Sequence, residues 1–350
     1  MRILSVTSVR NEGPYLLEWV AHHKAAGITD FVIYSNDCDD GTDAMLESLD
    51  QAGIVSHIPH EREEKKSIQW QAFKAAWKLP IRKEVDWILV SDVDEFLNIH
   101  ADGHDVPALL SKVPEDADGI VIPWRLYGNA GVVGIGDAPV TEQFTRAISP
   151  DTNYPVAAGM FKTLFRTKGP FNQLGVHRPK QRPEERAGLP RFVDGSGNAL
   201  PKSFASNQAR LSLFGYSTGR SLVEMNHYAV RSAAAFLLKR DRGLPNRTHK
   251  PVDLAYWVER NFNTVEDRSI HAMRPATEAV LQELLQIDGL KALHEQSVLW
   301  HRNRFAELVR EPEHLRLMIH ILTAGGSDVL PEALQHQLVR WYQEAHKTGG

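Results

Sequence analysis

Apolar residues in the first hundred positions follow two alternating patterns. Four short apolar runs are typical of buried parallel strands, namely 3–8, 31–35, 54–58 and 87–90. Three segments between them repeat apolar residues at helical spacing, namely 16–23, 42–49 and 65–77. Gly27 and Gly53 end the first two of these helices. The alternation of strand and helix predicts an open, mostly parallel α/β sheet with flanking helices.

The pattern changes beyond residue 119. Short β-like runs follow at 120–124, 160–166 and 222–225, separated by long polar loops. From Ser232 onward, apolar residues recur at helical spacing almost to the last residue. We therefore expect an α/β domain over residues 1–235, and over 236–350 a helical C-terminal region whose apolar stripes pack on the sheet domain.

Composition narrows the class of protein. The 350 residues include 40 Lys and Arg against 44 Asp and Glu, so the formal net charge of −4 argues against a nucleic-acid partner. One cysteine excludes a disulfide framework and a cysteine-rich zinc site. No apolar run approaches the roughly 20 residues that span a bilayer. We expect a cytoplasmic protein whose membrane contact, if any, is peripheral at the inner face.

Three carboxylates follow the fourth apolar run directly. Asp92 and Asp94 lie within the sequence Asp92-Val93-Asp94-Glu95, and on an extended segment both point to the same side. Their repulsion in a dry site favours a cation between them, and oxygen ligands suit Mn²⁺ or Mg²⁺. The alternative is a solvated acidic turn or a helix cap, and the apolar residues on both sides disfavour it.

A second acidic segment follows the run at 31–35. It holds four Asp in the seven residues 37–43, more than a turn requires. The first loop, with Asn11 and Glu12, falls at the neighbouring strand end. Ligands of open α/β sheets bind at the carboxyl ends of the strands. We therefore expect Asn11, Glu12, and Asp39 or Asp37 to border the base or ribose of a nucleotide.

Candidate partners for these acids lie far along the chain. His227, at the point where the β-rich middle gives way to the helices, is a candidate ligand to complete a metal site begun by Asp92 and Asp94, and His177 is the competing candidate. A basic cluster follows, and it either neutralises a diphosphate or forms a solvated helix face: Arg231, Lys239, Arg240 and Arg242.

Five motifs occur in an order that resembles a family 2-like glycosyltransferase, and more narrowly the bacterial branch related to family 92. They are Asn11-Glu12-Gly13, Asp40-Gly41-Thr42, Asp92-Val93-Asp94-Glu95-Phe96-Leu97, Trp124-Arg125-Leu126-Tyr127-Gly128, and His227-Tyr228 with Arg231-Ser232. The resemblance implies a GT-A fold and a nucleotide-sugar donor, UDP-linked, with Mn²⁺ or Mg²⁺ on the diphosphate. It also implies that Asp94 contacts the cation while Asp92 binds the ribose.

The resemblance further implies transfer with inversion to a glycan or glycolipid-type acceptor, as in polysaccharide biosynthesis. Inversion requires a general base opposite the diphosphate. Two departures from the wider family concern this point: Asn36-Asp37-Cys38 replaces a more acidic string, and no clear Glu-Asp pair supplies the base. Glu142, after the glycine-rich loop 128–136, is the first candidate; Asp137 and His177 are the alternatives. The alternative without a catalytic role is that Glu142 is an exposed strand residue.

Three other functions compete with transfer. A phosphohydrolase with Asp92 as nucleophile would carry its Asp-x-Asp after the first strand, whereas three strands precede it here. A non-catalytic nucleotide- or carbohydrate-binding protein would tolerate loss of the metal-binding acids, whereas Asp92, Asp94 and Glu95 are all present here. A nicotinamide dehydrogenase would show Gly-x-Gly-x-x-Gly after the first strand, and this chain has none there.

Overall fold

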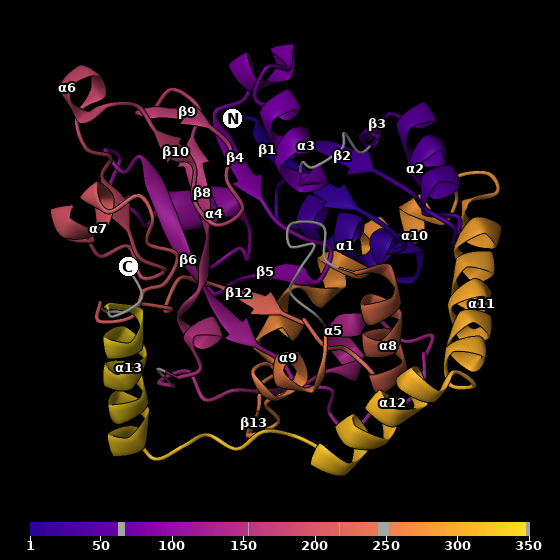
Figure 1. The fold of residues 1–350 in the computed structure, drawn as a ribbon. Coiled ribbons are helices and arrows are strands. Elements are labelled where there is room, and N and C mark those ends of the chain that lie inside the picture. The colour runs from indigo at the N-terminus through magenta and orange to yellow at the C-terminus, as the bar shows by residue number, and fades with distance from the viewer. Residues whose placement is uncertain (62–66, 153, 217, 244–251, 348–350) are drawn as a thin grey trace.

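The computed structural model describes residues 1–350 except 62–66, 153, 217, 244–251 and 348–350 (Figure 1). The helix predicted over 65–77 falls partly outside the described residues; within them, α3 (Ile68–Ala76) begins after the extended Ser67. Among the described residues, no helix combines the length and the apolar character needed to cross a bilayer.

A mixed sheet forms the centre of the molecule, with strand order β3-β2-β1-β4-β8-β6-β12-β5 and β11 beside β6 (Figure 1). Its strands are β1 (Ile3–Val9), β2 (Asp30–Ser35), β3 (Ser56–Pro59), β4 (Trp87–Val90), β5 (Glu95–Ile99), β6 (Gly119–Leu126), β8 (Phe161–Arg166), β11 (Phe192–Val193) and β12 (Val223–His227). Strand β8 runs antiparallel to β4 and β6, and β5 runs antiparallel to β12. All other pairs are parallel, which confirms the predicted α/β class.

Helices cover both faces of this sheet, and most of the chain after β12 is also helical. The longer ones are α1 (Gly13–Ala25), α2 (Thr42–Gln51), α3, α8 (Ala233–Arg242), α10 (Arg274–Leu284), α11 (Leu290–Leu308), α12 (Pro312–Ala324) and α13 (Glu332–Lys347). The shorter ones are α4 (Val106–Leu110), α5 (Val140–Gln143), α6 (Glu184–Ala187), α7 (Lys202–Ser206), α9 (Leu254–Val258), η1 (Pro80–Lys83), η2 (Val156–Gly159) and η3 (Ser269–Met273). Two small ladders pair β9 (Phe171–Gln173) with β10 (Lys180–Gln181) and β7 (Arg146–Ala147) with β13 (Val265–Glu266).

The first strand shows why both faces of the sheet need cover. Successive side chains of β1 point to opposite faces. Ile3 packs in the apolar cluster that contains Trp19 of α1, whereas Leu4 packs in the cluster that contains Phe73 of α3. All seven residues of β1 are buried, and its three polar members, Ser5, Thr7 and Ser8, are small.

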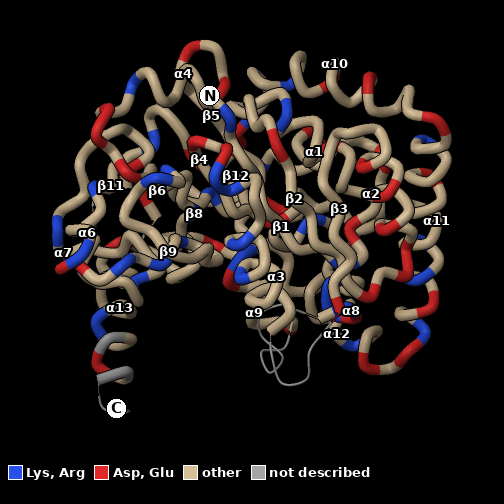
Figure 2. The backbone as a smooth tube through the Cα atoms, turned by 90° about the horizontal axis from the view of Figure 1, so that it is seen from above, with Lys and Arg blue, Asp and Glu red and all other residues tan. Residues whose placement is uncertain are grey.

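The C-terminal helices divide into two groups. Helices α10 and α11 pack against α1, and α12 packs against α8 and α9. Helix α13 lies on the other side of the molecule from α11, beyond α7, in both views (Figures 1 and 2). The backbone N–H of Tyr154 donates to Gln335 Oε1 of α13 at 3.2 Å. The division at residue 235 stays a prediction.

Candidate active site

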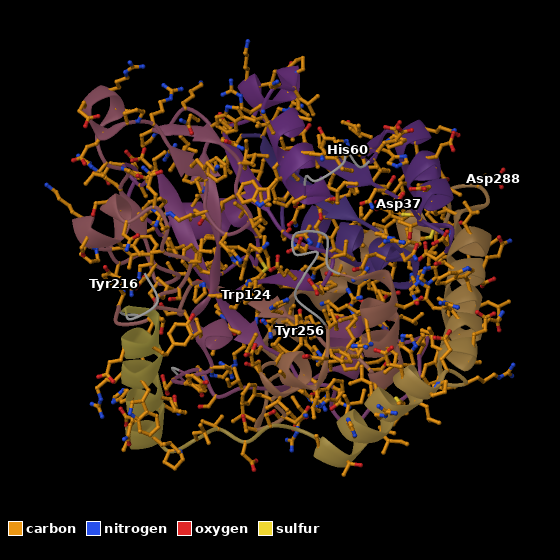
Figure 3. All side chains as sticks on the ribbon, in the orientation of Figure 1. Asp37, His60, Trp124, Tyr216, Tyr256 and Asp288 are labelled. Atoms are coloured by element: carbon orange, nitrogen blue, oxygen red, sulfur yellow. The ribbon has the colours of Figure 1, made fainter. Side chains whose placement is uncertain are left out.

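A cleft of about 410 Å³ opens at the carboxyl ends of β1, β2 and β4. Side chains of α3, β6, β12, α8, α9 and α13 complete its walls. Trp124 of β6 and Tyr256 of α9 line it near the centre of the molecule (Figure 3). Acidic and basic side chains both line it: Arg10, Glu12, Asp92, Asp94, Lys239, Arg242, Glu259 and Arg260. The structure therefore brings part of the predicted site together in one cavity.

The Asp92–Glu95 segment is a turn, and the extended conformation expected from the sequence is wrong. The backbone N–H of Glu95 donates to the Asp92 carbonyl at 3.0 Å, because β4 ends at Val90 and the chain reverses into β5. Lys162 Nζ of β8 lies 3.0 Å from Asp92 Oδ2 and 3.0 Å from Glu95 Oε2. Gln69 Nε2 donates to Asp92 Oδ1 at 3.0 Å. Asp92 is thus held by protein groups on both of its oxygens.

Lys162 is the buried counter-cation of these two acids. Burial alone would lower the pKa of Lys162, but the Asp92 and Glu95 carboxylates outweigh burial and raise it above its ordinary value. Burial raises the pKa of Glu95 to about 8. One of the two acids around the ammonium, Glu95, therefore resists ionisation.

Asp94 has a different set of partners. Lys239 Nζ donates to Asp94 Oδ2 at 2.7 Å, and His227 Nε2 lies 3.7 Å from Asp94 Oδ1. Burial would raise the pKa of Asp94, but Lys239 and His227 hold it well below its usual range. Burial lowers the pKa of His227 below its ordinary value, which favours the neutral imidazole.

Asp94 and His227 have the chemistry and spacing of metal ligands. Their 3.7 Å separation is too long for a hydrogen bond. Two atoms that are each about 2.0–2.2 Å from one cation can lie that far apart. A carboxylate and a neutral imidazole are also the protonation states that a metal requires. Among the described residues, no three His, Cys, Asp or Glu side chains converge as a complete site.

Glu12 and Arg231 come together as partners of each other. Arg231 Nη1 lies 2.8 Å from Glu12 Oε2, and Arg242 Nη2 pairs with the other oxygen. All three side chains are largely buried, and Arg242 Nη1 also donates to the Arg10 carbonyl at 2.6 Å. This network ties the loop after β1 to α8. It leaves Glu12 and Arg242 on the cleft wall, with Arg231 behind them.

The other predicted nucleotide-binding residues lie beside the cleft. Asn11 Oδ1 accepts from the Asp39 N–H at 2.8 Å, which joins the loops after β1 and β2. Asn11 and Asp39 line an open hollow of about 630 Å³ that also includes Arg10, Arg242 and Trp300. Because Arg10 and Arg242 line both spaces, the hollow and the cleft adjoin. Asp37 is exposed and lies away from Trp124 and Tyr256 (Figure 3).

Asp40, in the same acidic segment, is a buried structural residue. Its Oδ2 accepts from the Gly13 N–H at 3.0 Å and faces His301 Nε2 at 2.8 Å. Burial raises its pKa, yet the hydrogen bond with His301 and those from Thr42 bring it down to about 2. The carboxylate thereby joins the start of α1 to α11.

The three candidate bases are separated. Glu142 pairs with Arg274 Nη2 at 2.5 Å in a small hollow beside α10, and Asp137 pairs with Arg302 at 2.7 Å. Neither lines the cleft. His177 does. Its Nδ1 donates to the Phe161 carbonyl at 3.0 Å, so Nε2 of the neutral ring carries a lone pair. Burial lowers the pKa of His177 to about 4.

Sequence reasoning missed Lys162 and Gln69. Lys162 interrupts the apolar strand Phe161–Arg166, and its side chain is 0% exposed. A charged residue in a buried strand requires a partner of opposite charge, so this interruption was a usable signal. Gln69, on a helix face, gives no comparable signal.

Comparisons with known proteins agree on one family. A sequence profile of glycosyltransferase family 92 matches residues 6–189. A family 92 protein of Ricinus communis is 32% identical over 96 residues, which are 27% of this chain and 16% of that protein. One of Oryza sativa subsp. japonica is 27% identical over 95 residues, or 26% and 15% of the two chains. The match thus spans about a sixth of these plant proteins. The narrower resemblance to a bacterial branch stays a prediction.

Two solved structures show distant likenesses. Staphylococcus aureus TarS residues 1–349 has a TM-score of 0.34 and 11% identity, over 89% of this chain and 91% of that one. The mannosyltransferase PcManGT of Pyrobaculum calidifontis, in complex with GDP-Man and Mn²⁺, has a TM-score of 0.28 and 10% identity, over 92% and 85%. Likenesses this weak carry no argument about this chain.

Proposed function

Because this chain belongs to glycosyltransferase family 92, we propose that it transfers a sugar from a UDP-linked donor to a hydroxyl group of a glycan or glycolipid-type acceptor. The observation that carries the proposal is the cleft at the strand ends, where Asp94 and His227 lie beside Lys239 and Arg242. Two cations and a pair of metal ligands at one place suit the negative charge of a leaving nucleoside diphosphate.

The donor is proposed to lie across the cleft and the adjoining hollow. Lys239 and Arg242 face the diphosphate, and Asn11 and Asp39 in the hollow face the nucleoside. Asp94 and His227 would hold Mn²⁺ or Mg²⁺, with the remaining ligands from the diphosphate and water. Such an ion, when bound, stabilises the negative charge on the leaving diphosphate. Asp92, held by Lys162 and Gln69, is proposed to border the ribose.

The general base of an inverting transfer is proposed to be His177. Of the three candidates it is the one that lines the cleft, and its Nε2 is free of a proton at neutral pH. In the transfer, an acceptor oxygen attacks the anomeric carbon on the face opposite the diphosphate, and His177 Nε2 takes the hydroxyl proton. The sugar–phosphate bond breaks with its electron pair leaving on the diphosphate.

Two matched variants separate His177 from Glu142. His177→Gln should lower turnover with an oligosaccharide acceptor about 10²–10⁴-fold, the usual contribution of a general base. Glu142→Gln should leave turnover near normal, because Arg274 holds that carboxylate outside the cleft. Donor affinity, measured by calorimetry, should be unchanged in both. The reverse pattern of turnover would transfer the role to Glu142.

The acceptor is proposed to enter from the side of α13. Tyr342 of α13 and Tyr256 of α9 both line the cleft, and aromatic faces provide apolar contact area for a sugar ring. Residues of both proposed regions, 1–235 and 236–350, would then build one active site.

The function itself is tested by nucleotide binding. Calorimetric titration with UDP, GDP and their sugar conjugates, with and without Mn²⁺, should show binding of UDP and its conjugates. A chain that binds no nucleotide under either condition would contradict the proposal.

A further inference from the structure

Lys239 has an unusual position for a cation in a metal site. Its ammonium group donates to Asp94 Oδ2 at 2.7 Å and to the Ala229 carbonyl at 2.8 Å. The side chain is only 11% exposed, at the last turn of α8. His227 Nε2 approaches the other oxygen of the same carboxylate. The Asp94 carboxylate therefore contacts the Lys239 ammonium through Oδ2 and faces the proposed metal position through Oδ1.

We propose that Lys239 is a resident counter-cation that keeps a free divalent ion out of the Asp94–His227 position, so that the ion enters together with the nucleotide diphosphate. The inference rests on the proposed function. It concerns the order and coupling of binding, which the proposed function leaves open.

The charges around Asp94 support this coupling. The negative charge of Asp94 is matched by Lys239, while the positive charges of Arg231 and Arg242 are paired with Glu12. His227 contributes no charge when neutral. A divalent ion at Asp94 Oδ1 would be separated from the Lys239 ammonium only by the Asp94 carboxylate. Because this place is buried, salt would screen their repulsion little. The free ion would meet repulsion from Lys239, because that ammonium already neutralises the Asp94 carboxylate.

A bound diphosphate changes this balance. It brings negative oxygens that accept hydrogen bonds from the Lys239 ammonium and ligate the divalent ion at the same time. The flexible four-carbon stem of lysine allows the ammonium to turn from Asp94 to a phosphate oxygen. Nucleotide and ion should therefore bind with positive coupling, each raising the affinity of the other by the same factor.

The test is direct Mn²⁺ binding, followed by electron paramagnetic resonance of the free ion. The wild-type protein should bind Mn²⁺ weakly alone and at least roughly 10-fold more tightly with saturating UDP, within the usual range of coupling. Lys239→Gln keeps a hydrogen-bond donor for Asp94 but removes the charge. It should bind Mn²⁺ alone roughly 10-fold more tightly than wild type.

Two controls isolate the charge. Lys239→Arg keeps the positive charge and should bind Mn²⁺ alone as weakly as wild type. Lys112→Gln removes an exposed lysine with no contact to the cleft and should also match wild type. Circular dichroism of each variant checks the fold. If Lys239→Gln does not fold, the ratio of wild-type affinities with and without UDP decides.

The outcomes separate this inference from the function. Equal Mn²⁺ affinity with and without bound UDP would overturn the inference and leave the transferase proposal standing. UDP binding without Mn²⁺ binding under any condition would likewise overturn the inference and leave the transferase proposal standing. An unchanged Mn²⁺ affinity in folded Lys239→Gln would also overturn it. Failure to bind any nucleotide would remove the proposed function, and the inference with it.

Discussion

Asp92 and Asp94 are two residues apart in the chain but contact different lysines. Lys162 holds Asp92, and Lys239 holds Asp94. The sequence shows the two acids after an apolar strand, which is enough to predict a charged site there. It does not show which acid faces which cation, because Lys162 and Lys239 join the site only through the pairing of β8 and the packing of α8. Each acid therefore has its own ion pair, and the sharing of one metal by Asp92 and Asp94 stays a prediction.

Two buried histidines predict how stability depends on pH. Burial lowers the pKa of His22 to about 4, and burial with the neighbouring His22 lowers that of His23 to about 3. In the unfolded chain both titrate near 6.5. The unfolded state therefore binds protons first as pH falls, and the free energy of unfolding should decrease from about pH 6.5 down to about pH 4.

Urea unfolding at pH 7.5, 6.5, 5.5 and 4.5 measures this decrease. His23→Gln should have a shallower dependence than wild type over that range, because one of the two groups no longer titrates. Comparison of the two slopes removes the contribution of all other titrating groups that the variants share. Parallel slopes would show that His23 is not a buried neutral group.

At the scale of elements, the sequence predicts where a strand lies better than it predicts which strands pair with it in the sheet. The apolar run 87–90 coincides with β4, and the run 31–35 falls within β2. The sequence does not indicate β5, which begins at Glu95 inside the acidic motif. Nor does it indicate that β8 lies between β4 and β6. Both depend on pairing between distant segments, and a short apolar run carries no information about its partner.

The contact of α1 with α11 gives a prediction at this scale. A Cβ atom on Gly13 would lie 1.9 Å from Ser297 Oγ and 2.7 Å from Ser297 Cβ, and both residues are buried. Gly13→Ala should lower the free energy of unfolding by about 1–3 kcal/mol through overpacking. Adding Ser297→Gly should recover part of that loss, measured as a double-mutant cycle in urea.

Gly134→Ala is the matched control for this cycle. A Cβ atom there meets nothing within 4 Å, so its effect should be small. Simple additivity of Gly13→Ala and Ser297→Gly would contradict the close approach of α1 and α11.

At the scale of the whole molecule, α13 separates from the other helices and returns to the cleft. Its residues belong to none of the three apolar clusters found among the described residues, yet Tyr342 lines the cleft. The sequence predicts a helical C-terminal region but not this placement, because the same amphipathic pattern fits any apolar surface. The family profile, which ends at residue 189, does not reach α13.

Neighbouring aromatic residues of α13 test its role. Tyr342→Ala should raise the KM for an oligosaccharide acceptor roughly 3- to 10-fold, the range expected from loss of one aromatic contact. Trp341→Ala should leave KM unchanged, because Trp341 is exposed and does not line the cleft. Donor affinity should be the same in both. Equal effects of the two substitutions on KM would remove α13 from the acceptor side.

The central claim is that Asp94 in this cleft serves donor-dependent sugar transfer, and release of UDP from UDP-sugars in the presence of Mn²⁺ tests it most directly. Asp94→Asn keeps the size of the side chain but removes the charge that Lys239 and the proposed ion require. It should lower UDP release by about 100-fold or more, comparable to loss of one transition-state contact. Asp102→Asn, at an exposed position outside the cleft, should retain wild-type rates. Wild-type rates of UDP release in a folded Asp94→Asn protein would contradict the account.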